Sequence, residues 1–307
     1  MQQAATHQTR AGHVALVGAP NAGKSTLLNA LIGERLSIVT SKAQTTRQNV
    51  TGIRTDEGAQ AIFLDTPGLL DPSNLLQRSM RAAAAQALDD ADVHVVVVDA
   101  AGKAVKEHRQ HILKALRDRN VPRILAINKI DVAPDGVVEE WRSWSEAAMA
   151  AVPVPLSALS GIGVDTLWTT IVERLPPSPF FYDPDDLSTE NLRFFVAELV
   201  RETALEALRQ EIPYGLACAV EEFREDQDPV YIQTTIYVER NSQKGIVVGK
   251  NGAQIRALGA RSREKIEALL GTRVYLDLWV KVLPGWRTKR ASLKRLGFAV
   301  PDDDAKR

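Results

Sequence analysis

The strongest constraint on the fold of this chain is the segment GAPNAGKS at residues 18–25. An apolar run with the composition of a strand ends at residue 18, and apolar residues recur at helical spacing over residues 24–32. The glycines at residues 18 and 23 let the backbone curl. Its N–H groups then converge at the helix N-terminus, where the helix dipole attracts an anion. The pattern G-x-x-x-x-G-K-[ST] in this context predicts a phosphate-binding loop between a strand and a helix.

The first half of the chain alternates short apolar, β-branched runs with longer helical patterns. The expected strands cover residues 13–18, 61–65, 93–99, 123–128 and 153–156, and the expected helices cover residues 24–32, 75–88, 106–119, 137–150 and 164–175. The run VHVVVV is apolar almost throughout, as in a strand covered on both faces, and its His94 is expected to be buried and hydrogen-bonded. This alternation predicts an α/β domain with a mostly parallel sheet.

Residues 176–184 contain four prolines, too many for a helix or a central strand. We therefore expect an interdomain linker whose aromatic residues can dock on one side. The elements expected after it are a helix at 191–210, strands at 215–223 and 230–239, a glycine-punctuated stretch at 245–252 that opens a helix to about residue 270, a strand at 273–283 and a basic helix at 288–296. This order predicts a second, α+β domain.

Composition narrows the class of protein. Hydrophobic residues make up 45% and charged residues 25% of the 307 residues, which excludes a disordered chain, collagen-like repeats and a disulfide scaffold. The single cysteine, Cys218, cannot form an internal bridge or a cysteine-based zinc site, so we expect a reducing, cytoplasmic compartment. A signal-peptide core and an apolar run of about 18 residues are both missing from the sequence, so we expect a soluble protein.

Charge is divided unevenly along the chain. Thirty-eight basic residues balance thirty-eight acidic ones, yet residues 240–295 are strongly basic. Considered alone, such a run is either a solvated helix face or a surface that neutralises phosphates.

Three further motifs each follow an expected strand: residues 65–68 (DTPG), 128–131 (NKID) and 157–159 (SAL). Asp65 can hold a magnesium-bound water, and the N–H of Gly68 can sense a terminal phosphate. Asp131 can accept hydrogen bonds from the ring N–H and amine of guanine while the Lys129 stem covers the ring. Each motif alone could be an ordinary turn, but four in this order at the carboxyl ends of strands predict one nucleotide site. Its expected nucleotide-binding residues are Gly18, Ala19, Pro20, Asn21, Ala22, Gly23, Lys24, Ser25, Thr26, Asp65, Thr66, Pro67, Gly68, Asn128, Lys129, Asp131, Ser157, Ala158 and Leu159.

With these four motifs the first domain resembles the small GTPase family. The resemblance implies a P-loop domain with a mixed six-stranded sheet, GTP or GDP as ligand, and Mg²⁺ held by Ser25, Asp65 and a threonine of the loop at residues 41–47. Motif alignment favours Thr46, with Thr45 as the alternative, and an ordinary capped loop remains the third interpretation. The residues expected to act in catalysis are Lys24, Thr46, Gly68 and Asn21.

The chain departs from Ras-like members of that family at Leu70, where they carry a water-orienting glutamine, and the neighbouring Leu69 is also apolar. We therefore expect slow intrinsic hydrolysis. Related GTPases with asparagine at the position of Asn21 hold a potassium ion near the phosphates, so K⁺ is a hypothesis for this chain. The alternative is that Asn21 caps its own turn.

In the second domain, residues 249–252 form a G-x-x-G element, which has weight only through its context. Its surroundings resemble the α-β-β-α-α-β order of the type II KH domain, whose loop clamps single-stranded RNA. The alternative is a helix N-cap in an unrelated α+β domain. The residues expected to bind RNA are Lys244, Gly245, Ile246, Val248, Gly249, Lys250, Asn251, Gly252, Ile255 and Arg256.

Taken together, the segments PNAGKST, QTTR, DTPG and NKID and the sequence of residues 238–252 are similar to the TrmE/Era-like GTPase family, over residues 12–298. The resemblance implies binding near the 3′ end of 16S ribosomal RNA, a role in maturation of the 30S subunit, a monomer, and peripheral association with the cytoplasmic face of the cell membrane. The expected organisation is a flexible N-terminus (1–11), a GTPase domain (12–175), a linker (176–186), a type II KH domain with a basic C-terminal helix (187–298) and an acidic tail (299–307).

Two other functions remain open from the sequence. One is a constitutive RNA-binding assembly factor with the nucleotide as a structural ligand, which Leu70 favours. The other is a membrane-associated signalling GTPase in which the basic helix at residues 287–295 contacts lipid.

Overall fold

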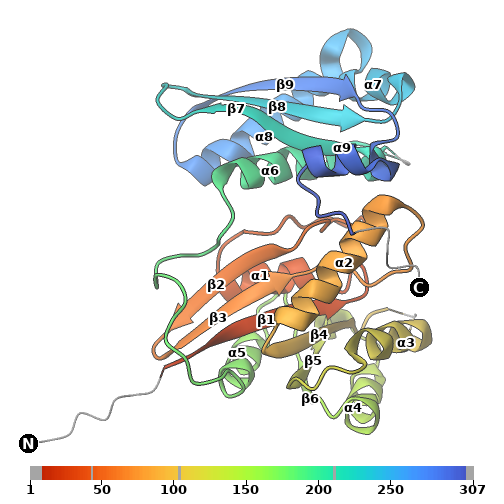
Figure 1. Cartoon of the computed structure of the whole chain (residues 1–307), viewed down its shortest axis with the longest axis vertical. Helices are drawn as coiled ribbons and strands as arrows, with labels where there is room; N and C mark the ends of the chain where they lie inside the picture. Colours follow the sequence, from red (N-terminus) through yellow and green to blue (C-terminus); the bar gives the residue numbers. More distant parts are fainter. Residues whose placement is uncertain (1–8, 43, 103–104, 210–211, 302–307) are drawn as a thin grey trace, which may run out of the picture. The chain divides into compact units, whose positions relative to one another are not determined.

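The computed structural model describes residues 9–42, 44–102, 105–209 and 212–301. The chain divides into two compact units, residues 1–71 with 80–189 and residues 72–79 with 190–307. Figure 1 shows the six-stranded sheet of the first unit and the three-stranded sheet of the second. Within the described ranges, none of the helices combines the length and apolar character needed to cross a bilayer.

The first unit is built on one mixed sheet with the strand order β2-β3-β1-β4-β5-β6. Its strands are β1 (Arg10–Gly18), β2 (Val50–Asp56), β3 (Ala59–Asp65), β4 (Val93–Asp99), β5 (Arg123–Asn128) and β6 (Val152–Pro155). Only the pairing of β2 with β3 is antiparallel among these strands. The mixed six-stranded sheet implied by the resemblance is therefore confirmed. The residue pattern alone had not revealed β2, because VTGIRTD contains a glycine and charged residues and lies at the edge of the sheet.

Helices cover both faces of this sheet (Figure 1). They are α1 (Lys24–Ile32), α2 (Leu75–Asp90), α3 (Val105–Leu116), α4 (Val137–Ala148) and α5 (Val164–Val172). Residues from α2, α3 and α4 pack with β1, β4 and β5 in one buried cluster that includes Leu88, Ile112 and Trp141. α1 and α5 cover the opposite face through Leu27, Leu28 and Leu167 and their neighbours. The carboxyl ends of β1, β3, β5 and β6 carry the four motifs.

β1 begins at Arg10, two residues before the expected start of the first domain at residue 12. Arg10 and Ala11 belong to β1, where they pair with Ala59 and Gln60, and Ala11 is fully buried. The first eight residues of the segment expected to be flexible lie outside the described ranges. RAGH contains no apolar run that would predict this start.

The segment after α5 stays attached to the first unit. The Oε1 atom of Gln60 accepts hydrogen bonds from the backbone N–H groups of Phe181 and Tyr182, at 2.8 and 3.0 Å. The ring of Phe181 stacks on His13, with 5.5 Å between centroids. The aromatic part of the proline-rich segment therefore packs against β1 and β3.

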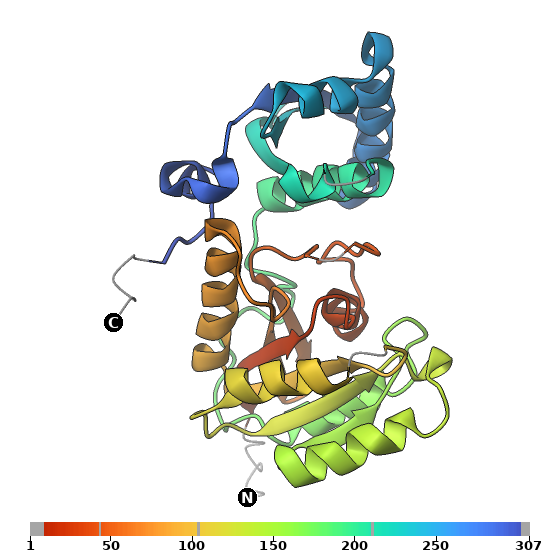
Figure 2. The same ribbon diagram turned by 90° about the vertical axis from the view of Figure 1, so that its right-hand side faces the viewer.

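The second unit places helices on one face of the sheet β7-β8-β9. Its elements are α6 (Leu192–Ala207), β7 (Ala217–Arg224), β8 (Val230–Val238), α7 (Asn241–Val248), α8 (Ala253–Leu270), β9 (Val274–Val282) and α9 (Arg290–Arg295). β7 and β8 are antiparallel, whereas β8 and β9 are parallel. In Figure 2 the chain can be followed from β9 to α9. Residues 302–307, most of the expected acidic tail, lie outside the described ranges.

One element of the second unit corrects the residue-by-residue interpretation. Residues 241–248 form α7, whereas the sequence predicts only a glycine-punctuated stretch at 245–252 that opens the next helix. Gly245 is a weak helix former, but it lies inside α7, and Val247 anchors the helix in the core. The resulting order α-β-β-α-α-β is the one that the resemblance implies.

Candidate functional site

The phosphate-binding loop connects β1 to α1 in a conformation that needs its glycines. Gly23 is the N-cap of α1 with a φ of 96°, and a Cβ atom at this position would lie 2.2 Å from Nδ2 of Asn128. A Cβ atom at Gly18 would lie 2.2 Å from the carbonyl oxygen of Val97. The loop can therefore curl around the N-terminus of α1 only with glycine at these two positions, which leaves its N–H groups available to an anion.

The ammonium group of Lys24 lies inside this loop. Its Nζ donates to the carbonyl oxygens of Gly18 and Ala19, at 3.2 and 3.0 Å, and the residue is only 6% exposed. Burial lowers the pKa of Lys24 to about 8, and the nearby carboxylate of Asp65 partly opposes that shift. A buried cation with two neutral partners is stabilised by an approaching phosphate, because the phosphate supplies the missing negative charge.

Three oxygen atoms meet beside the loop. The hydroxyl of Ser25 donates to Oδ2 of Asp65 at 2.6 Å, and Oγ1 of Thr46 lies 2.9 Å from Oγ of Ser25 and 3.4 Å from the same carboxylate oxygen. Oδ1 of Asp65 is buried and has no hydrogen-bond partner among the described residues. A compact set of carboxylate and hydroxyl oxygens with one unpartnered oxygen is the donor set that suits Mg²⁺.

The other threonine of this loop has different partners. The hydroxyl of Thr45 donates to the carbonyl oxygen of Lys42 at 2.7 Å and lies 2.8 Å from Oγ1 of Thr40. Of the two alternatives, Thr46 is the one seen in contact with both Ser25 and Asp65. Burial raises the pKa of Asp65, whereas Lys24 and three hydroxyl groups lower it, so an adjacent cation would favour the ionised carboxylate.

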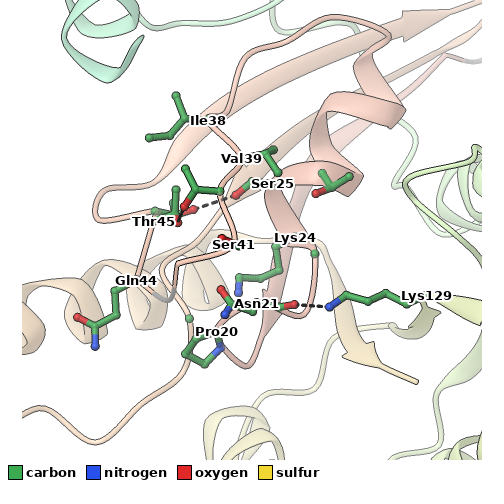
Figure 3. Close-up of a pocket in the computed structure, with 15 residues that line it drawn as sticks. Pro20, Asn21, Lys24, Ser25, Ile38, Val39, Ser41, Gln44, Thr45 and Lys129 are labelled. Carbon is green, nitrogen blue, oxygen red and sulfur yellow. Dashed lines mark hydrogen bonds between the residues drawn. The ribbon is translucent and has the colours of Figure 1, made fainter. Parts of the chain in front are cut away.

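A cavity of about 350 Å³ opens between the loop and the segment that precedes β2. It is lined by Pro20, Asn21, Gly23, Lys24, Ser25, Thr26, Ile38, Val39, Thr40, Ser41, Gln44, Thr45, Thr46, Gly68 and Lys129. Figure 3 shows Lys24 and Asn21 on one side and Thr45 with Ser41 on the other. Residues 38–40 were not expected at the site, and their only sequence signal is that they precede the polar loop.

A network of hydrogen bonds around Asn128 joins three motifs. Its Nδ2 donates to the carbonyl oxygen of Ala22 at 2.9 Å, and its Oδ1 accepts from the N–H groups of Lys129 and Ala158, at 2.8 and 2.9 Å. Asn128 is almost fully buried. The NKID and SAL segments are thereby tied to the phosphate-binding loop.

Lys129 spans the gap between the loop and β4. Its Nζ donates to the carbonyl oxygen of Asn21 at 2.8 Å, the bond drawn in Figure 3, and to Oδ2 of Asp99 at 2.6 Å. Sequence reasoning missed Asp99, although an acidic residue at the carboxyl end of β4 was a signal that could have found it.

Of the residues expected at the guanine base, Lys129 lines the cavity, whereas Asp131, Ser157, Ala158 and Leu159 are not among its lining residues. Asp131 is exposed within a short 3₁₀ turn (Ile130–Val132), and the N–H of Ile130 donates to the carbonyl oxygen of Leu156 at 3.3 Å. Ser157 is fully buried, whereas Leu159 is 84% exposed. The turn that carries Asp131 is thus held beside the SAL segment.

The DTPG segment begins at Asp65, the last residue of β3, and lies beside the phosphate-binding loop. The hydroxyl of Thr66 donates to the carbonyl oxygen of Leu16 at 2.8 Å, and Pro67 is buried. Gly68 approaches Pro20 so closely that a Cβ atom would lie 2.7 Å from its nitrogen. The next N–H, of Leu69, donates to the carbonyl oxygen of Gly18 at 3.0 Å.

In the second unit, the G-x-x-G element forms the sharp junction between α7 and α8. Gly249 has a φ of 72°, Asn251 one of 51° and Gly252 one of 75°. A Cβ atom at Gly249 would lie 2.6 Å from Cβ of Gln254. The backbone of this junction therefore depends on Gly249, as expected for a loop that approaches a ligand closely.

The residues expected to bind RNA divide into exposed and half-buried positions. Lys244, Gly245, Ile246, Lys250, Asn251 and Arg256 are exposed, whereas Val248, Gly249, Gly252 and Ile255 are half-buried. Ile246 exposes 53% of its surface, and Val248 and Ile255 pack against the core. The junction therefore presents cations and one large apolar side chain to solvent.

Comparisons with known proteins agree with both units. Residues 13–129 match the family described as 50S ribosome-binding GTPase, and residues 211–287 match the KH domain family. The GTPase Era of Carboxydothermus hydrogenoformans is 41% identical over 292 residues, which cover 94% of this chain and 98% of that protein.

Two crystal structures are similar over nearly the whole chain. A variant of Aquifex aeolicus Era bound to GDP·AlF4⁻ has a TM-score of 0.89 and 37% identity, and it covers 95% of this chain and 100% of its own. Era in complex with MgGDPNP and nucleotides 1506–1542 of 16S ribosomal RNA gives the same four values.

Proposed function

This chain belongs to the Era family of GTPases, and from that premise we propose that its nucleotide cycle controls the binding of 16S ribosomal RNA by the second unit. The observation that carries the proposal is the presence in one chain of the Ser25–Asp65–Thr46 oxygen cluster and a glycine-dependent junction at residues 249–252. Further support comes from the similar Era structure in complex with MgGDPNP and an rRNA segment. Through RNA binding the chain would assist maturation of the 30S subunit.

In the nucleotide site, we assign the phosphates to the backbone N–H groups of residues 18–25 and to the ammonium of Lys24. Ser25 and Thr46 would hold Mg²⁺ through their hydroxyls, and Asp65 would hold it through a water. When bound, the ion neutralises charge on the phosphate oxygens. Asp131 would accept the guanine N–H groups, since the bonds around Asn128 place its turn beside the loop.

Hydrolysis by these residues alone should be slow. The side chains of Leu69 and Leu70 carry no polar group that could orient water, so the chain contributes positioning and electrostatics only. We assign a potassium ion to the side chain of Asn21, which lines the cavity. Equal GTPase rates in potassium and sodium chloride would contradict this assignment.

RNA would bind along the α7–α8 junction. Close backbone approach at Gly249 and Gly252 suits a phosphodiester chain, and exposed Lys244, Lys250 and Arg256 supply positive charge. The exposed side chain of Ile246 offers an apolar contact for a base.

The bound nucleotide should change the affinity for RNA in a direction that follows from the two states of the loops. GTP orders the segments that carry Thr46 and Gly68, and we expect that state to bind RNA more tightly than the GDP state. The test is the affinity for an RNA of the 1506–1542 segment with GDPNP and with GDP. Equal affinities would show that the bound nucleotide does not control RNA binding.

A double variant and a single-substitution control test where the RNA binds. Lys250→Glu with Gly252→Asp should abolish RNA binding, while Lys114→Glu, an exposed lysine of α3 in the first unit, should leave it unchanged. If both variants bind RNA like the natural chain, the site lies elsewhere.

Leu70 favours a second candidate function, a constitutive RNA-binding assembly factor with a structural nucleotide. That candidate predicts no GTP turnover with RNA and potassium present. Measurable turnover under those conditions supports control of RNA binding by the nucleotide cycle.

The basic residues of α9 and its flanks favour a peripheral membrane contact. Such a contact should be electrostatic, because the described part of this segment has few large apolar residues outside the buried Leu293. Flotation with anionic vesicles should then decrease between low and high salt, and a salt-independent result would contradict it.

We also expect a monomer, which light scattering after gel filtration tests directly.

A further inference from the structure

The side chain of Asn29, on α1, binds the backbone where the chain enters the loop around the nucleotide. Its Oδ1 accepts from the N–H groups of Leu36 and Ser37, at 3.0 and 2.9 Å. Its Nδ2 donates to the carbonyl oxygen of Ser37 at 2.8 Å. One side chain thus satisfies both backbone groups of Ser37, so it fixes this residue in position and orientation.

The helix that carries Asn29 also carries Ser25, one turn earlier. Residues four apart lie on the same face of a helix, so both side chains point to the same side of α1. α1 is anchored in the core by Leu27, Leu28 and Leu31, each exposed by 1% or less. The position of Ser37 is therefore set by the same rigid element that presents Ser25.

Ser37 uses this position to contact the carboxylate of Asp65. Its hydroxyl donates to Oδ2 at 3.0 Å, and the residue is 3% exposed. The same oxygen accepts from Ser25 and Thr46, the two hydroxyls assigned to the ion. Ser37 is the one of these three hydroxyl donors that has no assigned metal role, so its bond to Asp65 does not compete with metal coordination.

From these contacts we propose that Asn29 and Ser37 are positioning residues for the magnesium site. Asn29 fixes the start of the loop at residues 37–46, and Ser37 holds the Asp65 carboxylate so that Oδ1 stays directed away from the hydroxyl cluster. The inference rests on the magnesium site of the proposed function. Partners that orient a metal-binding group typically change metal affinity by roughly 10- to 100-fold when they are removed.

A purely structural role would give a different result. If Ser37 only satisfied a buried carboxylate, its removal would lower stability without changing the dependence on Mg²⁺. Ser145 provides a matched control, because it is a fully buried serine of α4 whose hydroxyl donates to the carbonyl oxygen of Ala151 at 2.7 Å.

The experiment uses the full chain and titrates Mg²⁺ against retention of a fluorescent GDP analogue, with thermal unfolding recorded in parallel. Ser37→Ala should raise the half-saturating Mg²⁺ concentration about tenfold, and GDP affinity in EDTA should stay unchanged. Ser145→Ala should lower the unfolding temperature without changing the Mg²⁺ titration. An unchanged titration for Ser37→Ala, or an equal shift for the control, would overturn the proposal.

Asn29 is tested in the same assay and by hydrogen exchange. Asn29→Ala should raise the half-saturating Mg²⁺ concentration and speed amide exchange in residues 36–42, while α1 remains protected. Asn29→Asp keeps the acceptor for Leu36 and Ser37 but loses the donor, so it should give a smaller exchange effect and covers the case in which the alanine variant does not fold. Normal exchange in both variants would contradict the role of Asn29.

If the natural chain itself showed no dependence on Mg²⁺, the magnesium site and this inference would both fail. A dependence on Mg²⁺ that is equal in all variants would contradict only the inference.

Discussion

The backbone N–H of Ala158 donates to Oδ1 of Asn128 over 2.9 Å, and this bond connects two loops that are thirty residues apart. The amide of the same asparagine reaches the carbonyl oxygen of Ala22. One buried side chain therefore holds the NKID segment, the SAL segment and the phosphate-binding loop together. Because the chain positions both sides through Asn128, nucleotide affinity and local stability should depend on it together.

Replacing Asn128 with alanine should weaken both properties. The substitution removes three hydrogen bonds and leaves buried backbone groups unpaired, each of which costs about 1–3 kcal/mol. We expect the free energy of unfolding to fall by about 2–4 kcal/mol and GDP to bind at least roughly tenfold more weakly. Urea denaturation and nucleotide titration measure the two effects.

Asn191 serves as the control for that variant. Its side chain caps α6 in the second unit by accepting from the N–H of Phe194. Asn191→Ala should cost about 1 kcal/mol and leave GDP affinity unchanged. If Asn128→Ala behaves in the same way, then Asn128 has no special role at the site.

Asp131→Asn should change which base the site accepts. A carboxylate accepts from both N–H groups of the guanine edge, whereas an amide can accept one and donates to the C2 carbonyl of xanthine. Hydrogen bonds to charged groups contribute about 1.5–3 kcal/mol, so GTP affinity should fall at least roughly tenfold and xanthosine triphosphate should compete better than in the natural chain.

The control for Asp131→Asn is Asp135→Asn, an exposed carboxylate four residues later. That variant should retain the preference for guanine nucleotides. Unchanged discrimination in Asp131→Asn would show that another group recognises the base.

The sequence predicted the parts of the site that are local in the chain. The loop at residues 18–25 and the junction at 249–252 are set by glycines at fixed spacing, and strand ends place Asp65 and Asn128. These features follow from backbone sterics and from the rule that parallel strands end at one edge.

Other parts could not be predicted, because they depend on contacts between distant segments. Asn29 and Ser37 look like an ordinary helical asparagine and an ordinary loop serine until the fold brings Asn29 against the backbone of Ser37, and the hydroxyl of Ser37 against Asp65. Arg10 and Ala11 are recruited into β1 by pairing with β3, although their own sequence favours no strand. Tertiary pairing decided these positions, and local propensity did not.

Gly249→Ala should destabilise the α7–α8 junction. The residue has a positive φ, and the added Cβ would lie 2.6 Å from Cβ of Gln254, so the backbone must shift. We expect a loss of about 1–3 kcal/mol in the free energy of unfolding of the second unit and weaker RNA binding.

A matched glycine lies within α8. A Cβ atom at Gly259 would have nothing within 4 Å, so Gly259→Ala should stabilise the helix by about 0.5–1 kcal/mol and leave RNA binding intact. Urea unfolding and RNA titration of both variants test the pair. Equal effects at the two positions would contradict the strained junction.

His94 should make stability depend on pH. It is fully buried in β4, its Nε2 lies 2.8 Å from the carbonyl oxygen of Leu88, and burial lowers its pKa from the usual value of 6.5. In the unfolded chain the ring binds a proton as the pH falls below 6.5, whereas in the folded chain it binds the proton only at a lower pH. The unfolded state then carries more bound protons, so the free energy of unfolding decreases as the pH falls, by at most about 1.4 kcal/mol per pH unit for this group.

Comparing the natural chain with His94→Gln isolates this contribution, because every other titrating group is common to both proteins. Glutamine can still donate to Leu88 but does not titrate. The stability advantage of the natural chain over the variant at pH 7.5 should therefore shrink between pH 6.5 and pH 5.5 in urea denaturation. Curves that stay parallel over this range would mean that His94 takes up its proton equally well in the folded and unfolded chain.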